Sequence, residues 1–209
     1  MLEQFILKIS EIFWSFQGEG LRTGEPSIFI RLAGCSLRCP YCDTKYSWDK
    51  GVGMSIQEIM ITVNDLKKNY PVSQIVITGG EPFEQDLSDL IEGLKRENFF
   101  ISIETNGLYY QDLRFEWLSV SPKDVSDYFI HPDLCKRMNE VKLLVNDSFD
   151  IDALSRIRTI GNHFIIFLQP EYYTVDKYKK VFNIYEKAQS LGIPNIRIGC
   201  QLHKIYDVL

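Results

Sequence analysis

Three cysteines lie close together in the sequence, at Cys35, Cys39 and Cys42, with the spacing Cys-x3-Cys-x2-Cys. Only five cysteines occur in 209 residues, so this grouping indicates a shared metal centre rather than chance. No histidine stands nearby to complete a tetrahedral zinc site. An iron–sulfur cluster that only carries electrons takes four ligands from the protein. The local count of three therefore predicts a cluster with one iron left open.

The two other cysteines, Cys135 and Cys200, are isolated in the sequence. Free cysteine is usually a small, buried and chemically inert residue. We therefore interpret both as buried thiols rather than as a fourth cluster ligand. A zinc knuckle or a redox-active thiol loop remains the alternative interpretation of the three-cysteine segment.

Polar or glycine-rich segments follow most of the apolar strands that the sequence predicts. The carboxyl ends of parallel strands meet at one edge, and barrel enzymes build their active sites on the loops there. Glu81, Glu104, Lys123 and Gln169 should therefore meet at one rim, although each alone could be an exposed turn residue. The segments that follow the strands are 78–82 (TGGEP), 104–107 (ETNG), 121–123 (SPK), 169–170 (QP) and 200–204 (CQLHK).

Two further features point to a ligand site. In the segment 15–20 (SFQGEG), two glycines flank a carboxylate, which lets the backbone approach a ligand and present Gln17 and Glu19 to it. The alternative is a plain turn. Arg31 lies within the apolar stretch 27–32, where an unpaired arginine is unusual. It either pairs with a neighbouring carboxylate or offers its guanidinium to a substrate carboxylate.

Short apolar strands alternate with helices along the chain, which predicts a parallel sheet with right-handed crossovers. We expect one α/β domain over residues 1–209. The chain is short for a complete eight-stranded barrel, so we expect a partial, open parallel β/α barrel of about six strands. Ser55 and Glu58 form a capping-box pattern that predicts a helix start. The expected strands are 4–13, 27–32, 74–78, 99–103, 117–120, 140–145, 164–168 and 195–199, and the expected helices are 55–70, 86–97, 150–160 and 174–191.

The composition, with 45% hydrophobic residues, is that of a globular protein with one sizeable core. The net charge is −5 and the sequence has no basic run, so electrostatics do not favour binding to nucleic acid. We therefore expect a small-molecule substrate. We expect no membrane span and no secretory leader, because the apolar runs are short and interrupted by charges. The odd number of cysteines does not suggest a disulfide framework and indicates the reducing cytoplasm.

The cysteine spacing, with the aromatic Tyr41 directly before Cys42, resembles the motif of the radical S-adenosylmethionine (SAM) enzymes. The resemblance implies a 4Fe-4S cluster on Cys35, Cys39 and Cys42 whose open iron binds the methionine end of SAM. An electron from the cluster then splits the sulfonium to give a 5′-deoxyadenosyl radical, so the cofactor performs the difficult chemistry. In these enzymes the GGEP segment receives the SAM amino group through main-chain carbonyls and a carboxylate, here Glu81.

A narrower resemblance, over nearly the whole chain, is to the 7-carboxy-7-deazaguanine synthase family. It is carried by FQGEG at 16–20, G-x-P-x-x-F-x-R-x-x-G-C at 24–35, Cys-Asp-Thr at 42–44, TGGEP, ETNG, SPK and His203-Lys204. It implies a carbon–nitrogen lyase that converts 6-carboxy-5,6,7,8-tetrahydropterin to 7-carboxy-7-deazaguanine with loss of ammonia, in queuosine biosynthesis for tRNA modification. Hydrogen would be taken from pterin C6, the ring would contract, and the returning hydrogen would regenerate SAM.

The same resemblance implies roles for individual residues. Thr44 would bind Mg²⁺, a hard cation that prefers oxygen ligands. The substrate would contact Phe16, Gln17, Gly18, Glu19, Arg31, Thr78 and Leu209. SAM would contact Tyr41, Cys42, Asp43, Gly80, Glu81, Glu104, Asn106, Ser121, Pro122, Lys123, Gln169, Pro170, Glu171 and Tyr172. A flavodoxin or ferredoxin as electron donor and a homodimer are also implied.

Two other functions are compatible with the cysteine loop. A glycyl-radical-enzyme activase has a similar size and the same cysteine spacing, but it needs a protein partner and has no use for FQGEG or for a metal at Thr44. From a different class, the chain could be an iron–sulfur electron carrier, which would need a cluster fully ligated by the protein. These alternatives differ from the main hypothesis in metal content and in the role of Thr44.

Overall fold

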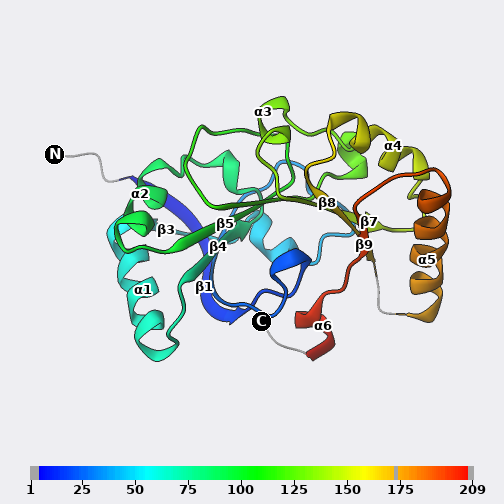
Figure 1. Ribbon diagram of the computed structural model, residues 1–209. Helices are drawn as coiled ribbons and strands as arrows, with labels where there is room; N and C mark the ends of the chain where they lie inside the picture. The colour runs from blue at the N-terminus through cyan, green and yellow to red at the C-terminus, as the bar shows by residue number, and fades with distance from the viewer. Residues whose placement is uncertain (1–4, 172–173, 207–209) are drawn as a thin grey trace.

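The computed structural model describes residues 5–171 and 174–206, which form one curved sheet with helices around it (Figure 1). Nine strands in this part of the chain pair in the order β3-β1-β2-β4-β5-β6-β7-β8-β9. From β2 to β9 neighbouring strands are parallel, whereas β1 and β3 join antiparallel at one edge. The strands are β1 (Ile6–Phe16), β2 (Pro26–Leu32), β3 (Val52–Ser55), β4 (Gln74–Gly79), β5 (Phe100–Thr105), β6 (Trp117–Val120), β7 (Glu140–Val145), β8 (Ile165–Pro170) and β9 (Ile196–Ile198).

The sheet stays open, because β3 and β9 are its two edges. This confirms the expected partial, open β/α barrel. Its parallel part has seven strands in the described residues, slightly more than the expected number of about six. No helix in the described part of the chain is long and apolar enough to cross a bilayer.

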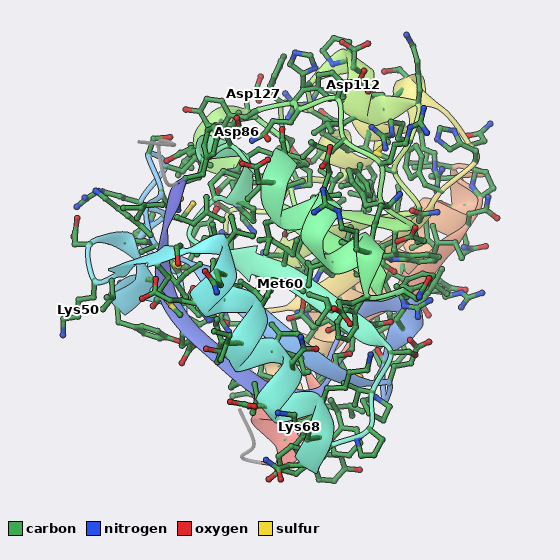
Figure 2. All side chains as sticks on the ribbon, turned by 90° about the vertical axis from the view of Figure 1, so that its left-hand side faces the viewer. Lys50, Met60, Lys68, Asp86, Asp112 and Asp127 are labelled. Carbon is green, nitrogen blue, oxygen red and sulfur yellow. The ribbon has the colours of Figure 1, made fainter. Side chains whose placement is uncertain are left out.

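Most of the helices cover the outer face of this sheet. Figure 2 shows α1 and α2 side by side over one end, with Met60 between them. Helix α6 lies on the opposite side of the sheet from α3 and α4 (Figure 1). The helices are α1 (Ile56–Asn69), α2 (Ser88–Arg96), α3 (Pro132–Cys135), α4 (Ile151–Ile160), α5 (Val175–Ser190) and α6 (Leu202–Tyr206).

Alternate residues along the parallel strands face opposite sides of the sheet, and the two sides differ in composition. On β2, β4 and β5, the side chains of Ile28, Ile77 and Ile103 are fully buried in the hydrophobic core shared with the outer helices. Toward the carboxyl ends of the strands, the residues facing the inner side become polar, as at Thr78 and Glu104. The fold therefore collects polar groups inside the curve of the sheet.

The predicted elements agree with the structure except at short segments. The capping box is confirmed: the Glu58 N–H donates to Ser55 Oγ at 3.3 Å, and the Ser55 N–H donates to Glu58 Oε2 at 2.8 Å. Strand β3 and helices α3 and α6 were not predicted, because four or five residues carry too little periodicity to reveal an element. The start of the expected strand 4–13 lies partly outside the described residues.

Candidate functional site

A cavity of about 270 Å³ lies on the inner side of the sheet, at the carboxyl ends of the parallel strands. The structure brings most of the sequence-predicted site residues to its wall, although they come from distant parts of the chain. These residues are Phe16, Gln17, Gly18, Glu19, Arg31, Cys35, Cys39, Tyr41, Cys42, Asp43, Thr44, Thr78, Gly80, Glu104, Asn106, Ser121, Lys123 and Gln169.

Four predicted SAM contacts do not line the cavity: Glu81, Pro122, Pro170 and Glu171. Pro122 and Pro170 each follow a residue that does line it, and successive residues in extended chain point to opposite sides. Glu171 instead accepts a hydrogen bond from Lys177 Nζ at 3.2 Å. These four SAM contacts therefore stay predictions. Tyr172 and Leu209, the remaining predicted contacts, lie outside the described residues.

The three-cysteine loop is held against the end of β4 by backbone hydrogen bonds. The Glu81 N–H donates to the Gly34 carbonyl at 2.7 Å, and the Gly80 N–H donates to the Leu32 carbonyl at 2.9 Å. A Cβ atom at Gly80 would lie 1.9 Å from the Gly34 oxygen, so only glycine permits this approach. The TGGEP segment therefore positions the loop that carries the cysteines.

All three cysteines of this loop line the cavity, whereas Cys135 and Cys200 do not. Both of these thiols are only partly buried, so the prediction that they are buried is wrong. Within the described residues, no three His, Cys, Asp or Glu side chains are placed to hold a single metal ion. A 4Fe-4S cluster has a different geometric requirement from a single metal ion, because each cysteine binds a separate iron and the sulfur atoms need only surround a common space. Three cysteines on one wall of an open cavity fit that requirement.

Two buried polar atoms of residues that line the cavity have no hydrogen-bond partner in the protein. They are Nδ2 of Asn106, a donor, and Oε1 of Gln169, an acceptor, and both residues line the cavity. Buried polar groups are normally satisfied, so an unused donor and an unused acceptor at a cavity are available to a ligand with matching groups. The amino, carboxylate, ribose and adenine groups of SAM provide both kinds of partner.

Glu81 is fully buried and serves the site indirectly. Its carboxyl group accepts hydrogen bonds from Thr105 Oγ1 at 2.6 Å, the Asn106 N–H at 2.7 Å and the Phe83 N–H at 3.1 Å. Burial raises its pKa to about 7, although these hydrogen bonds oppose the shift. Glu81 therefore fixes the ETNG loop that carries Asn106.

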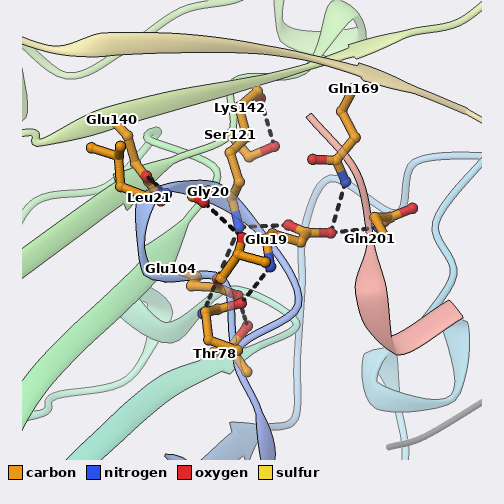
Figure 3. A network of polar contacts seen from close by, with 12 residues as sticks. Glu19, Gly20, Leu21, Thr78, Glu104, Ser121, Glu140, Lys142, Gln169 and Gln201 are labelled. Carbon is orange, nitrogen blue, oxygen red and sulfur yellow. Dashed lines mark hydrogen bonds and ion pairs between the residues drawn. The ribbon is translucent and has the colours of Figure 1, made fainter. Parts of the chain in front are cut away.

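A connected network of charged and polar side chains forms another wall of the cavity (Figure 3). At its centre, the Lys142 ammonium contacts Glu19 Oε2 at 2.6 Å and Glu104 Oε1 at 2.8 Å. Around it, four side chains donate to the two carboxylates: Gln169 and Gln201 to Glu19, and Gln17 and Thr78 to Glu104, at 2.5–3.1 Å. Glu104, a predicted SAM contact, thus shares this network with Gln17, Glu19 and Thr78, which are predicted substrate residues.

The charges of this network stabilise one another. Burial alone would raise the pKa of Glu19, but the Lys142 ammonium outweighs that effect and holds the pKa well below its usual range. Burial alone would likewise lower the pKa of Lys142, but Glu104 and Glu19 raise it. Lys142 is therefore an ammonium and Glu19 a carboxylate near neutral pH.

Arg31 pairs with a neighbouring carboxylate, which was one of the two interpretations of the sequence, and it also lies at the cavity. Its Nε donates to Glu11 Oε1 at 2.7 Å, so the arginine is paired, and its side chain also lines the cavity. The Thr44 hydroxyl lies 3.5 Å from Cys42 Sγ at the same wall. The site therefore offers a guanidinium and a hydroxyl near the cysteine loop, as a carboxylate-bearing ligand and a hard cation would need.

Helix α6 closes part of the cavity. The Leu202 N–H donates to the Gly18 carbonyl at 2.9 Å, and Lys204 Nζ contacts Asp43 Oδ2 at 2.6 Å. His203 lines the cavity next to Gly18, and burial lowers its pKa. This short helix thus ties the FQGEG segment to the cysteine loop.

Sequence reasoning did not identify Lys142, Gln201 and His203 as site residues, although all three line the cavity. A signal existed for Lys142, because a lysine stands inside the apolar segment 140–145 (EVKLLV), and buried lysine is rare unless it is paired. Gln201 and His203 belong to the segment that follows the last predicted strand. Their contact with the FQGEG segment depends on the closure by α6, which the sequence does not reveal.

Comparisons with known proteins agree with this geometry. The family model described as Radical SAM superfamily matches residues 29–202. The 7-carboxy-7-deazaguanine synthase of Aquifex aeolicus (strain VF5) is 33% identical, over 97% of this chain and 94% of that protein. The synthase of Escherichia coli (strain K12) is 34% identical, over 78% of this chain and 83% of that protein. The crystal structure of QueE from Escherichia coli has a TM-score of 0.77 at 30% identity and covers 94% of both chains. The chain belongs to the radical SAM superfamily and, within it, to the 7-carboxy-7-deazaguanine synthase family.

Proposed function

We propose that this chain is a radical SAM enzyme that converts 6-carboxy-5,6,7,8-tetrahydropterin to 7-carboxy-7-deazaguanine with loss of ammonia, in queuosine biosynthesis. The observation that carries the proposal is one cavity lined both by the three cysteines and by the Gln17–Glu19–Thr78 group. When bound, the 4Fe-4S cluster and SAM supply a 5′-deoxyadenosyl radical. The reaction class that we propose is that of a carbon–nitrogen lyase.

Two groups of cavity residues have different tasks in this proposal. One group, which consists of Gly80, Asn106, Ser121, Lys123 and Gln169 with Tyr41 and Asp43, binds SAM. Asn106 and Gln169 have the unused donor and acceptor that support this assignment.

In the second group, Gln17, Glu19 and Thr78 hold the pterin ring, with Phe16 and Gly18 beside it. Arg31 binds the pterin carboxylate, because a guanidinium fork matches a carboxylate in shape and charge. A reactive substrate that rearranges its ring must be held in one orientation, and fixed groups on several strands provide that restraint.

We also propose that Thr44 binds Mg²⁺. The position of its hydroxyl at the cavity wall supports the assignment, since Mg²⁺ prefers oxygen ligands and keeps several waters. The cation would tie the substrate carboxylate to the cysteine loop and so fix the register of the pterin.

The remaining proposals rest on the family resemblance and on cysteine use. A flavodoxin or ferredoxin supplies the electron, the chain acts as a single domain over residues 1–209, and two copies form a homodimer. All five cysteines are free, which supports a reducing cytoplasm as the compartment.

An anaerobic turnover assay tests the proposed function. The protein is reconstituted with iron and sulfide, reduced, and incubated with SAM, Mg²⁺ and the carboxypterin, with Cys39→Ala as the inactive control. We expect 7-carboxy-7-deazaguanine and ammonia in equal amounts, in excess over the SAM consumed. Accumulation of 5′-deoxyadenosine without the deazaguanine would refute the assignment.

A further inference from the structure

Lys142 on β7 has no role in the function described so far. Its side chain is only 7% exposed, lines the cavity, and contacts two carboxylates from different parts of the chain. Glu19 lies on the segment after β1, and Glu104 lies on β5 (Figure 3). A buried ion pair is weak evidence for stability, because apolar packing often stabilises a core equally well. The position of this lysine at the cavity wall therefore calls for a functional explanation.

The hydrogen bonds of the network show what Lys142 does. Each of its two carboxylate partners also accepts hydrogen bonds from two neutral side chains: Gln169 and Gln201 at Glu19, and Gln17 and Thr78 at Glu104. These bonds fix the orientations of the carboxylates, while the ammonium compensates their charge. Lys142 thereby connects the FQGEG segment to the sheet.

We propose that Lys142 is a positioning residue for the pterin substrate, holding Glu19 and Glu104 as two ionised, oriented carboxylates whose remaining acceptor capacity faces the N–H groups of the ring. The inference rests on the proposed function and adds to it a residue that acts through its two partners. A pterin presents amino and ring N–H donors, and an ionised carboxylate only accepts hydrogen bonds. A protonated carboxyl group would place a donor against those donors.

The surrounding charges predict how the network responds to loss of the ammonium. Two carboxylates that share a buried site cannot both stay ionised without a cation, so the pKa of one of them rises strongly. The charged and titratable groups that face Lys142 and its two partners are Glu140 on β7, Cys200 after β9 and His203 on α6, with Lys204 and Asp43 next to His203. Burial lowers the pKa of His203, so its imidazole does not replace the lost cation near neutral pH.

The test compares Lys142→Met with wild type as anaerobic, cluster-loaded protein. Calorimetry without reductant measures carboxypterin binding in the presence of SAM, and turnover is measured from about pH 6 to about pH 9. We expect the pterin Kd to rise at least about tenfold, as for a lost charged hydrogen bond, with SAM affinity and iron content within about twofold of wild type. We also expect variant turnover to fall as the pH decreases, where wild type stays level.

Two further variants separate charge from structure. Lys142→Arg keeps the cation, so its pH profile should stay level even if the larger side chain lowers kcat. Lys68→Met removes an exposed lysine that pairs with Asp65 on α1, and it should change neither binding nor the pH profile.

If Lys142→Met does not fold, the double variant Lys142→Met/Glu104→Gln removes one charge of each sign. We expect that variant to fold, to bind pterin weakly and to lack the pH dependence.

Three results would overturn the inference. The first is a Lys142→Met protein that has the pterin affinity and the pH profile of wild type. The second is a Lys142→Met protein that loses SAM affinity and pterin affinity equally, which would indicate a structural role. The third is a double variant that binds pterin with wild-type affinity. A wild-type protein that binds no carboxypterin would instead refute the proposed function, and this inference with it.

Discussion

Thr44 is the residue at which the metal proposal can be tested alone. Its hydroxyl lies at the cavity wall, 3.5 Å from Cys42 Sγ. Replacing it by alanine removes one oxygen ligand, so we expect Thr44→Ala to lower kcat/KM at least about tenfold at limiting Mg²⁺. Titrating Mg²⁺ in the turnover assay measures this. Thr44→Ser keeps the hydroxyl and serves as the control, and an identical Mg²⁺ response in both variants would contradict the assignment.

The buried Glu81 carboxyl group leads us to predict how the free energy of unfolding depends on pH. Burial raises its pKa from 4.5 to about 7 in the folded protein, so between these values the folded state binds more protons than the unfolded state. The stabilisation of the folded state that follows from this pKa difference is fully present below pH 4.5 and is lost as the pH rises through about 7. The free energy of unfolding falls by up to about 3 kcal/mol over this range. We expect Glu81→Gln to be destabilised overall by about 1–3 kcal/mol but to lack this slope.

Thermal unfolding of wild type and Glu81→Gln at about pH 5 and about pH 8 measures the difference. Other groups titrate in both proteins, so only the change in slope between them reports Glu81. Equal slopes in the two proteins would show that the Glu81 carboxyl is ionised throughout this range.

At the residue scale, the sequence reveals which side chains meet but not which way each one points. The cysteines, Gln17 and Glu19 were predicted from type and spacing, and they line the cavity. Glu81 was expected at the cavity and is buried behind it. Two of its hydrogen-bond donors, on Thr105 and Asn106, are distant in the sequence, and the third is the Phe83 N–H of the turn that follows Glu81. Such partners have no sequence signature.

At the scale of elements, the contact between α6 and the FQGEG segment makes a prediction about Gly18. A Cβ atom there would lie 2.2 Å from His203 Nδ1 and 3.1 Å from the His203 backbone nitrogen, so α6 would have to move. We expect Gly18→Ala to raise the KM for the carboxypterin at least about tenfold and to change the free energy of unfolding by less than about 1 kcal/mol, since α6 buries little.

Gly93→Ala on α2 is the matched control. Its Cβ would meet Met60 Sδ at 3.4 Å, an ordinary contact with a flexible side chain, and alanine favours a helix over glycine by about 1 kcal/mol. That variant should keep the wild-type KM and unfold at a slightly higher temperature. A Gly18→Ala protein with an unchanged KM would show that α6 does not shape the substrate site.

The longer elements were predictable because their periodicity reflects the physics of burial. Fully buried residues such as Ile75 and Ile77 alternate with inward-facing ones, and the Ser55–Glu58 capping box marks the start of α1. Strand β3 was not predicted, because its four residues include a glycine and form only through pairing with β1. Tertiary contacts, rather than local preference, create such elements.

At the scale of the whole molecule, the curvature of the open sheet brings the cysteine loop, the FQGEG segment and the strand ends to one cavity. The sequence predicted this convergence from the parallel topology, because the carboxyl ends of the strands share one rim. The family resemblance then supplied the chemistry. The closure by α6 and the central place of Lys142 depend on the assembled fold and were beyond what periodicity or spacing could predict.

The distribution of cysteines over the molecule predicts which of them hold iron. Replacing Cys35, Cys39 or Cys42 by alanine should abolish iron binding, whereas Cys135→Ala and Cys200→Ala should retain it, because neither of those residues lines the cavity. Iron and sulfide analysis of the five purified variants checks this. Loss of iron in Cys135→Ala or Cys200→Ala would mean that the cluster has a fourth protein ligand.

The measurement that tests the central claim most directly is electron paramagnetic resonance of the reduced, reconstituted protein with and without SAM. The claim is that the protein supplies three cysteines and leaves one iron for SAM. The account predicts the signal of a reduced 4Fe-4S cluster whose g-values change when SAM is added. A cluster signal that stays the same at saturating SAM would contradict it.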